Sequence, residues 1–205
     1  MRSVVICGVL LATVASAAEQ QSTPELESRR TFIGLAPIAL GQGLLAVDGE
    51  RALGPKLSAR LGVRLGAGVF KRGAGEFQGD SSRLSMGVEP GLRYYLTGTA
   101  LDGLWLGGNV EFSHQRSDST SDGLTGQVIN RDRDWSAGVA TLVGYSMVVS
   151  RGLTIQAGVG LGASYNSGQL TVRDTSNPPS LQEAHFDNTY WGISERATLA
   201  LGWAF

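Results

Sequence analysis

Three residues in one short stretch, EFSHQRS, have the types needed for hydrolysis: Glu111, His114 and Ser117. A histidine can act as general base toward a serine hydroxyl within hydrogen-bond reach, and a carboxylate can orient that histidine. His114 and Ser117 are three positions apart, however, so in an extended strand their side chains point to opposite faces. The other histidine, His185, lies in a long polar segment. This spacing argues against a catalytic pair, and an exposed histidine is the simpler interpretation.

A second group of residues with chemical potential is a set of charged side chains on the polar side of alternating segments. Charges of both signs at such positions predict either ion pairs that fill an interior or the lining of a polar pore. If the alternating segments are the strands of an eight-stranded barrel, its interior is only just wide enough for side chains. This width favours a plug of ion pairs over a pore. The set comprises Arg60, Arg64, Arg83, Glu89, Arg93, Glu111 and Arg196.

No metal or cofactor site is predicted. The long polar segments carry several aspartates, but without calcium-loop spacing, and such segments are commonly just solvated. The only cysteine, Cys7, falls in the first 18 residues. A chain that loses those residues forms neither a disulfide nor a thiolate metal site. The aspartates are Asp118, Asp122, Asp132, Asp134, Asp174 and Asp187.

The elements that must position these residues are strands. From Leu153 to Asn166 apolar and polar residues alternate over 14 positions. Such a strand has one apolar and one polar face, and it is long enough to cross a bilayer when tilted. The alternation recurs at 57–66, 84–94, 104–112, 135–145 and 191–205.

The first 18 residues have the layout of a secretory signal peptide: one cation at Arg2, an apolar run, and small residues at Ala15–Ala17. The segment 19–30 is expected to be a polar periplasmic linker, and 31–205 a single barrel domain. Without Arg2 the chain has two more acidic than basic residues. It therefore has no basic field that would attract nucleic acid.

Connections alternate between short and long, as in bacterial outer-membrane barrels. Short ones fall at 54–55, 97–103 and 150–152, and long polar ones at 71–82, 115–133 and 167–188. This pattern predicts six strands after Lys56. A first hairpin, with strands at 31–40 and 44–53 and a turn at 41–43, brings the total to eight. The predicted fold is an all-β, eight-stranded antiparallel up-and-down transmembrane barrel.

The polar faces indicate which side of the barrel wall faces inward. They hold mostly Gly, Ser, Asn and Gln, whereas a water-facing surface would carry many more charges. The apolar face is therefore expected to meet lipid, between two aromatic belts. The outer belt is predicted at Phe70, Phe112, Trp135, Tyr165 and Trp191, and the periplasmic belt at Tyr94, Tyr95, Tyr145, Trp203 and Phe205.

Two residues disturb the pattern. Pro90 cannot donate to the hydrogen-bond ladder, which predicts a bulge at 89–91. Glu195 falls on the lipid face of the last strand, where a charge is costly, and a register shift nearby would remove it from that face.

With these features the chain resembles the OmpA/OmpX-like family of small outer-membrane β-barrel proteins over 31–205. The resemblance rests on architecture and on the C-terminal pattern ATLALGWAF. It implies a chain in contact with outer-membrane lipid and lipopolysaccharide, and a terminal signal read by the barrel-assembly machinery. The residues that match this signal are Leu199, Leu201, Trp203 and Phe205.

The resemblance gives location and fold better than activity, because many functions share the scaffold. The expected role is non-enzymatic, either structural or in surface interaction through the long loops. The alternatives are a narrow porin-like channel and, well behind it, a lipid A-modifying enzyme. Lipid A deacylases of similar size use a His-x-Ser pair, whereas His114 and Ser117 have the spacing His-x-x-Ser. The oligomeric state stays open.

Overall fold

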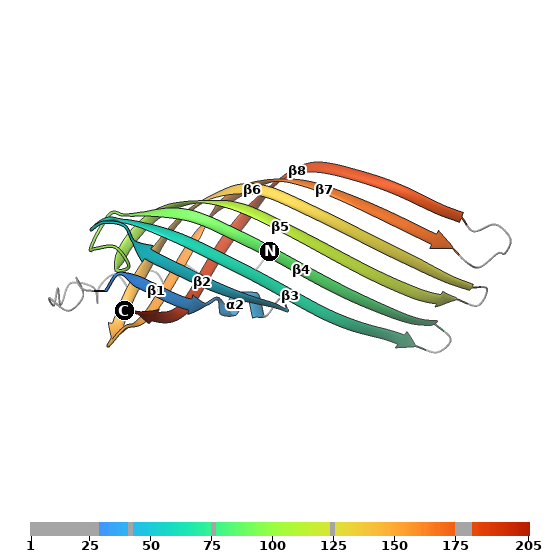
Figure 1. Ribbon diagram of the computed structural model, residues 1–205, viewed down its shortest axis with the longest axis horizontal. Coiled ribbons are helices and arrows are strands. Elements are labelled where there is room, and N and C mark those ends of the chain that lie inside the picture. The colour runs from blue at the N-terminus through green and yellow to red at the C-terminus, as the bar shows by residue number, and fades with distance from the viewer. Residues whose placement is uncertain (1–28, 41–42, 75–76, 124–125, 175–181) are drawn as a thin grey trace, which may run out of the picture.

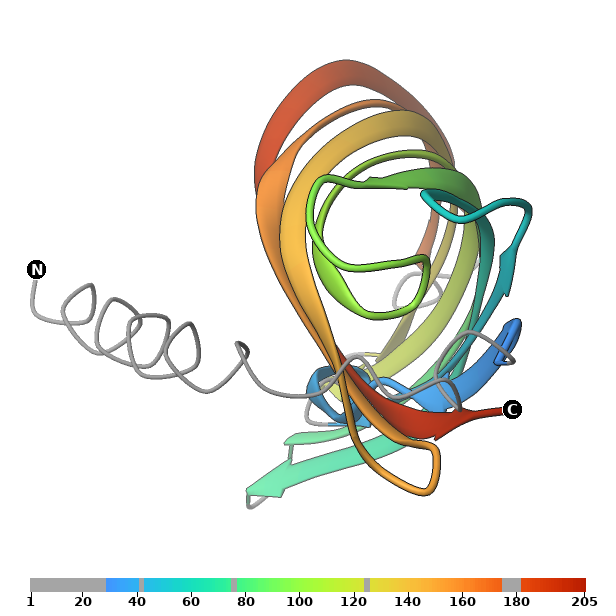
Figure 2. The same cartoon turned by 90° about the vertical axis from the view of Figure 1, so that its left-hand side faces the viewer.

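The computed structural model describes residues 29–40, 43–74, 77–123, 126–174 and 182–205. In these ranges eight antiparallel strands pair in chain order and close on themselves, which confirms the predicted up-and-down barrel (Figures 1 and 2). No helix in the described ranges has the length and apolar character needed to cross a membrane. The strands are β1 (Thr31–Leu35), β2 (Leu44–Ala52), β3 (Leu57–Ala74), β4 (Phe77–Tyr95), β5 (Gly103–Gly123), β6 (Gly126–Ser150), β7 (Leu153–Asp174) and β8 (Gln182–Ala204).

The alternation along each strand decides which side chains face inward. On β3, Leu61 and Leu65 are exposed on the outer surface, whereas Ser58 and Arg60 are buried inside. On β5, Leu106 is outside and Trp105 is inside. The apolar face is therefore the exterior of the barrel, the reverse of a soluble barrel.

The first hairpin differs from the prediction. Its first strand was expected over 31–40, but β1 ends at Leu35 and a short helix, α2, follows at Pro37–Leu40. Proline lacks the N–H that a ladder needs, and its fixed φ suits the first position of a helix. The second strand, β2, begins at Leu44 as predicted and ends one residue earlier, at Ala52.

The long polar connections also differ from the prediction. The segments expected as loops at 71–82, 115–133 and 167–188 are mostly strand, so β3 to β8 run far past β1 and β2 as an arched sheet (Figure 1). For example, Ser119 pairs with Asn130, and Thr171 pairs with His185. Backbone pairing continues there because it needs no apolar face. The end of the apolar alternation therefore does not mark the end of the strand.

Neither predicted irregularity takes the expected form. The β4–β5 register is the same before and after Glu89 and Pro90, so the missing proline N–H interrupts the ladder without producing a bulge. The β7–β8 register is continuous through Leu161↔Glu195, so no shift removes Glu195 from the outer face. Glu195 is exposed there.

The outer aromatic belt is partly visible as a packed row. Tyr165 on β7 lies between Trp135 on β6 and Trp191 on β8, with ring centroids 5.5 and 5.3 Å apart. At the opposite end, Tyr95 was predicted to belong to the second belt, but it is fully buried inside the barrel. Tyr95 is the neighbour of exposed Tyr94, and strand alternation turns it inward.

Candidate functional site

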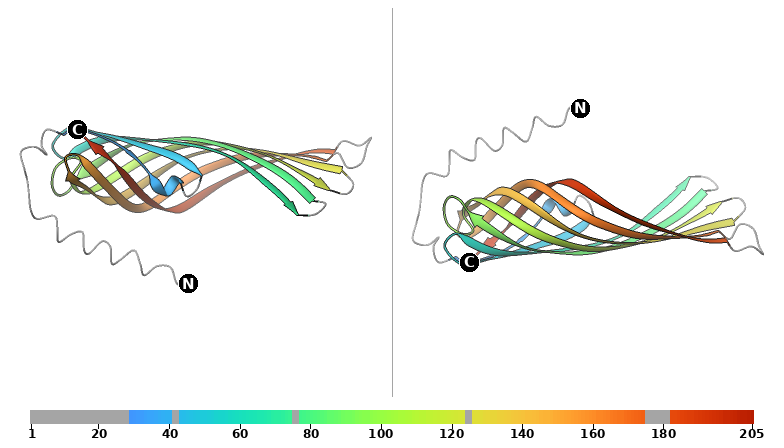
Figure 3. Two further views of the ribbon diagram at one scale, coloured as in Figure 1. Left: turned by 90° about the horizontal axis from the view of Figure 1, so that it is seen from below. Right: turned by 90° about the horizontal axis from the view of Figure 1, so that it is seen from above.

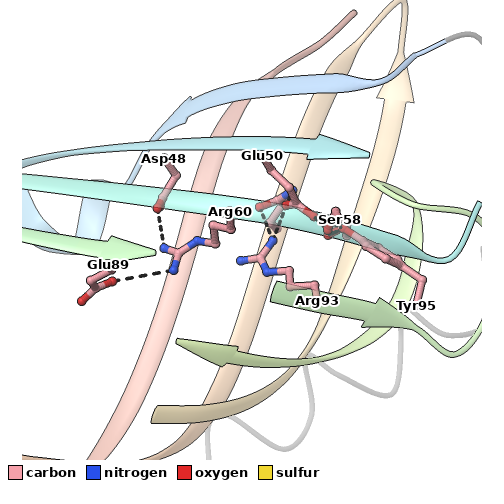
Figure 4. A network of polar contacts seen from close by, with 9 residues as sticks. Asp48, Glu50, Ser58, Arg60, Glu89, Arg93 and Tyr95 are labelled. Carbon is pink, nitrogen blue, oxygen red and sulfur yellow. Dashed lines mark hydrogen bonds and ion pairs between the residues drawn. The ribbon is translucent and has the colours of Figure 1, made fainter. Parts of the chain in front are cut away.

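The carboxylate of Glu50 is the centre of a buried polar network in the closed part of the barrel (Figure 4). It accepts hydrogen bonds from the hydroxyl of Ser58 at 2.5 Å and the hydroxyl of Tyr95 at 2.7 Å. It also accepts from Arg93 at 2.5 Å and from the amide of Gln156 at 2.9 Å. Strands β2, β3, β4 and β7 thus meet at one carboxylate, which fixes their relative positions across the bore.

A second group of charges lies next to this centre. Arg60 pairs with Asp48 and lies 3.7 Å from Glu89, and all three side chains are buried. Glu89 also pairs with Arg64 at 2.6 Å. Arg64 is the solvent-facing member of the group, with 41% of its side chain exposed. The chain of alternating charges therefore runs from the closed end toward the open half of the barrel.

A third group of charges is the ion pair that joins Arg196 of β8 to Glu111 of β5 across the barrel. Both side chains are mostly buried, at 28% and 14% exposure. The three groups together bring six of the seven predicted interior charges into one continuous region.

Arg83 departs from the predicted set. It lies on the concave side of β4, but at a level where β1 and β2 no longer complete the wall, and its side chain is exposed. There it donates to the amide oxygen of Gln115. The alternation along β4 correctly predicted that Arg83 lies on the inner face. Alternation does not show how far along the barrel axis a residue lies.

Aromatic side chains fill the bore beside the charges. Trp105 is almost completely buried, and the guanidinium of Arg93 lies 4.0 Å above its ring. The space for the indole is provided by Gly144 and Gly158, where an added Cβ would lie 2.3 and 2.7 Å from Trp105. These contacts and the ion pairs fill the bore around Glu50 and Trp105 with side chains.

Five members of this network were absent from the predicted set. Asp48 and Glu50 fall at alternate positions of β2, in the hairpin whose course was hardest to infer from the sequence. Ser58 and Gln156 are uncharged, and Tyr95 was assigned to a belt. The sequence carried one signal for Asp48 and Glu50: they lie two and four positions after Ala46, and alternate residues of a strand share a face. All three side chains face inward.

The concave face of the extended sheet forms a second polar region, with a cavity of about 590 Å³. Amides, carboxylates and aromatic rings line it, among them Gln115, Asp134, Asn166, Asn188 and Tyr190.

Within this cavity the carboxylate of Asp134 lies close to Gly168. A Cβ added at position 168 would be 2.2 Å from the Oδ1 atom of Asp134. Burial raises the pKa of Asp134, and the neighbouring carboxylate of Asp132 raises it further. Asp134 is thus a carboxyl that gains a proton more readily than an ordinary aspartate.

The predicted hydrolytic residues do not converge in the structure. Glu111 and Ser117 share the inner parity of β5, whereas His114 lies on its outer, exposed face. Glu111 is paired with Arg196. Among the described residues, no group of three or more His, Cys, Asp or Glu side chains is arranged to hold a metal ion.

Three residues of the terminal pattern, Leu199, Leu201 and Trp203, lie on the outer face of β8, the strand that closes the barrel. The fourth, Phe205, directly follows the last residue of this strand. Leu201 pairs with Leu35 of β1, and the backbone of Phe205 exchanges hydrogen bonds with Thr31 at 2.8 and 3.0 Å.

No family model and no curated protein matches this chain. Among solved structures it is similar to a major outer membrane protein from Thermus thermophilus, with 15% identity and a TM-score of 0.46, over 86% of this chain and 99% of that one. This likeness is too distant to transfer a function. Membership of the OmpA/OmpX-like family stays a prediction.

Proposed function

We propose that this chain is an integral outer-membrane β-barrel protein with a non-enzymatic role at the cell surface. The observation that carries the proposal is the inverted barrel: a continuous apolar exterior around a buried, charged interior. Leu161 is 61% exposed, Val139 is 59% exposed and Ile193 is 84% exposed, whereas Glu50 is 3% exposed. Water disfavours an apolar exterior of this extent, and lipid requires it.

The proposed placement puts the row Trp135–Tyr165–Trp191 at the outer interface and Trp203 at the periplasmic one. The segment 1–18 acts as the export signal and is removed; it lies outside the described residues, as does most of the linker 19–30. The terminal pattern from Leu199 to Phe205 is the segment that the barrel-assembly machinery would recognise. These steps follow from the sequence pattern and the family resemblance.

The surface role is assigned to the extended sheet beyond the outer aromatic row. Its concave face offers amide, carboxylate and hydroxyl groups beside the rings of Phe186 and Tyr190. Such a lining suits a hydroxyl-rich partner, and the sugar portion of lipopolysaccharide or of a neighbouring cell surface has this chemistry. A structural role in the envelope needs only the barrel, whereas a surface role needs this extension.

Membrane fractionation with unheated and heated gel samples tests the location. The full chain is expected in the outer-membrane fraction, with a mobility that changes on heating. A protein recovered from the soluble periplasm, with the same mobility in both samples, would overturn the proposal.

A charge on the lipid face provides a quantitative test of the orientation. Val139→Arg is expected to lower the free energy of unfolding in a lipid bilayer by about 2–4 kcal/mol, because the arginine replaces an apolar side chain near the membrane centre. The matched control is Thr120→Arg, on the outer parity of β5 but in the polar extension. It should change stability by less than about 0.5 kcal/mol. Equal effects would show that Val139 faces water.

The filled bore predicts that the protein does not conduct. Purified barrel in planar bilayers should give no discrete, reproducible openings, because ion pairs and Trp105 occupy the closed part. Regular openings from pure protein would instead support the narrow porin-like channel.

An absence of acyl-chain release from lipopolysaccharide is expected as well. Release that is lost in His114→Ala would favour the lipid A-modifying enzyme.

A further inference from the structure

The strands β1 and β2 complete the wall at one end of the barrel only. β1 pairs with β8 at positions 201–204, although β8 begins at Gln182. β2 covers β3 only as far as Gly66, although β3 ends at Ala74. Among the described residues no strand joins these two edges, so a gap remains beside β8, and β3 to β8 continue as an open, curved sheet (Figure 3). The concave face of this extension is therefore left without a covering strand.

Two exposed aromatic rings lie on this concave face along β8. Phe186, Asn188 and Tyr190 are alternate residues of the strand, so their side chains share one face, and all three line the cavity of about 590 Å³. Phe186 and Tyr190 are each 56% exposed, although most of the lining is polar. At about 3.3 Å per residue, the two aromatic residues are about 13 Å apart along the strand. A ligand that contacts both rings must therefore be longer than a single sugar ring.

The middle of the cavity has a depression where a glycine replaces a side chain. Gly168 of β7 pairs with Asp134 of β6 on one side and with Asn188 of β8 on the other. A Cβ added at position 168 would meet only the carboxyl group of Asp134 within 4 Å. The carboxylate of Asp134 and the amide of Asn188 thus flank a depression that has backbone as its floor.

The polar groups around this depression can both donate and accept hydrogen bonds. Arg83 donates to the amide oxygen of Gln115, which leaves the NH₂ group of Gln115 as a donor on the strand next to Asp134. The carboxylate of Asp134 accepts, and the amide of Asn188 does both. A sugar hydroxyl also donates and accepts, so neighbouring hydroxyls of one sugar ring fit these three groups.

The charge of the cavity favours a neutral ligand. Among the described lining residues the charged groups are the carboxylates of Asp132 and Asp134. Burial and Asp132 raise the pKa of Asp134, and Arg83 opposes this rise, so the guanidinium lies near the two carboxylates. Two carboxylates and one guanidinium leave a net charge of −1, which repels an anionic sugar and is too small to select a cation.

We propose that the concave face of the extension binds a neutral oligosaccharide. One sugar unit lies over Gly168 and forms hydrogen bonds with Asp134 and Asn188, and the flanking units place their C–H groups against the negative ring faces of Tyr190 and Phe186. The cavity of about 590 Å³ lies within the range of small-molecule sites. This site rests on the proposed surface role, since it specifies the class of sugar that the extension meets.

Binding of the full chain in phosphatidylcholine nanodiscs to an immobilised glycan array tests this site. The array carries hexose and N-acetylhexosamine series from monosaccharide to hexasaccharide, and uronic-acid series of the same lengths. We expect at least one neutral series to bind, with the tetrasaccharide at least about tenfold tighter than the monosaccharide because it reaches both rings. The uronic-acid series should bind at least about tenfold more weakly, since their carboxylates meet Asp132 and Asp134.

Two glycine variants separate this site from the rest of the concave face. Gly168→Ala displaces the carboxylate of Asp134, which is the end of a flexible side chain, and is expected to lower the affinity at least about tenfold. Gly192→Ala is the matched control on the same face of β8: an added Cβ there has no contact closer than 3.7 Å, and the affinity should not change. Both variants must keep the heat-dependent mobility of a folded barrel. Where Gly168→Ala does not fold, Tyr190→Ala takes its place, with the same expected loss.

Absence of binding to every neutral series, equal binding of the uronic-acid series, equal affinity for monosaccharide and tetrasaccharide, or equal behaviour of the two glycine variants would each overturn the oligosaccharide site. A dimer that Tyr190→Ala dissociates, without saccharide binding, would assign the face to contact between copies of the chain and would overturn it as well. These results would leave the folded, membrane-inserted barrel intact. Failure of the proposed function gives a different result, namely a soluble chain without heat-dependent mobility.

Discussion

Glu50→Ala is expected to lower the free energy of unfolding by about 3–5 kcal/mol, because it leaves the buried guanidinium of Arg93 without its carboxylate. The change also removes the acceptor shared by Ser58, Tyr95 and Gln156. Unfolding by guanidinium chloride in detergent micelles, followed by the heat-dependent mobility shift and tryptophan fluorescence, measures the loss.

The matched control is Arg116→Ala, which breaks an ion pair with Asp118 in the polar extension. The two side chains are 48% and 34% exposed, so this pair should contribute less than about 1 kcal/mol. Glu50→Gln is expected to fall between the two, since it keeps acceptor capacity and loses the charge. If Glu50→Ala and Arg116→Ala are equally mild, the buried network does not hold the strands together.

Gly202→Val is expected to prevent closure of the barrel. Gly202 faces Gly34 of β1, and a Cβ at position 202 would lie 2.1 Å from the carbonyl oxygen of Ile33 and 2.4 Å from the Cα of Gly34. Both contacts are with backbone, so neither can be relieved by a rotamer change. The cost should reach about 3 kcal/mol or more, at the upper end for overpacking. The measurement is the fraction of protein with the compact, unheated mobility after refolding into micelles.

The effect is large because the seam is short. β1 and β8 pair over four positions only, whereas β7 and β8 pair over 22. Gly108→Val is the control: an added Cβ there meets no atom within 4 Å, and the residue faces outward on β5. It should fold as the native chain does. Normal folding of Gly202→Val would mean that the β1–β8 seam does not limit closure.

Much of the fold could be predicted because lipid-facing strands have a strict pattern. The alternation at 153–166 identified β7, and its continuation around the chain predicted eight strands and their order. The pattern failed where another constraint was stronger, at Pro37, which starts α2 rather than extending β1. It also failed beyond the aromatic row, because backbone pairing of Ser119 with Asn130 needs no apolar face.

The candidate site was predictable only in part. Parity along β3 and β4 placed Arg60, Glu89 and Arg93 on the inner face, but it could not say which carboxylate each arginine meets. Glu50 was missed, although it accepts four hydrogen bonds, because its role depends on the register of β2 against β3. That register depends on long-range pairing, which a single sequence does not display.

By itself the sequence determined the class of the protein: strands of period two, apolar on one face and polar on the other, in a number that closes a barrel. This information is local, because the face on which a residue lies can be read from the residues two positions before and after it. Tertiary structure alone decided three things. Four side chains converge on Glu50, Arg83 lies beyond the part of the barrel that β1 and β2 close, and a gap remains beside β8. Each depends on strand length and register, which result from pairing between segments far apart in the chain.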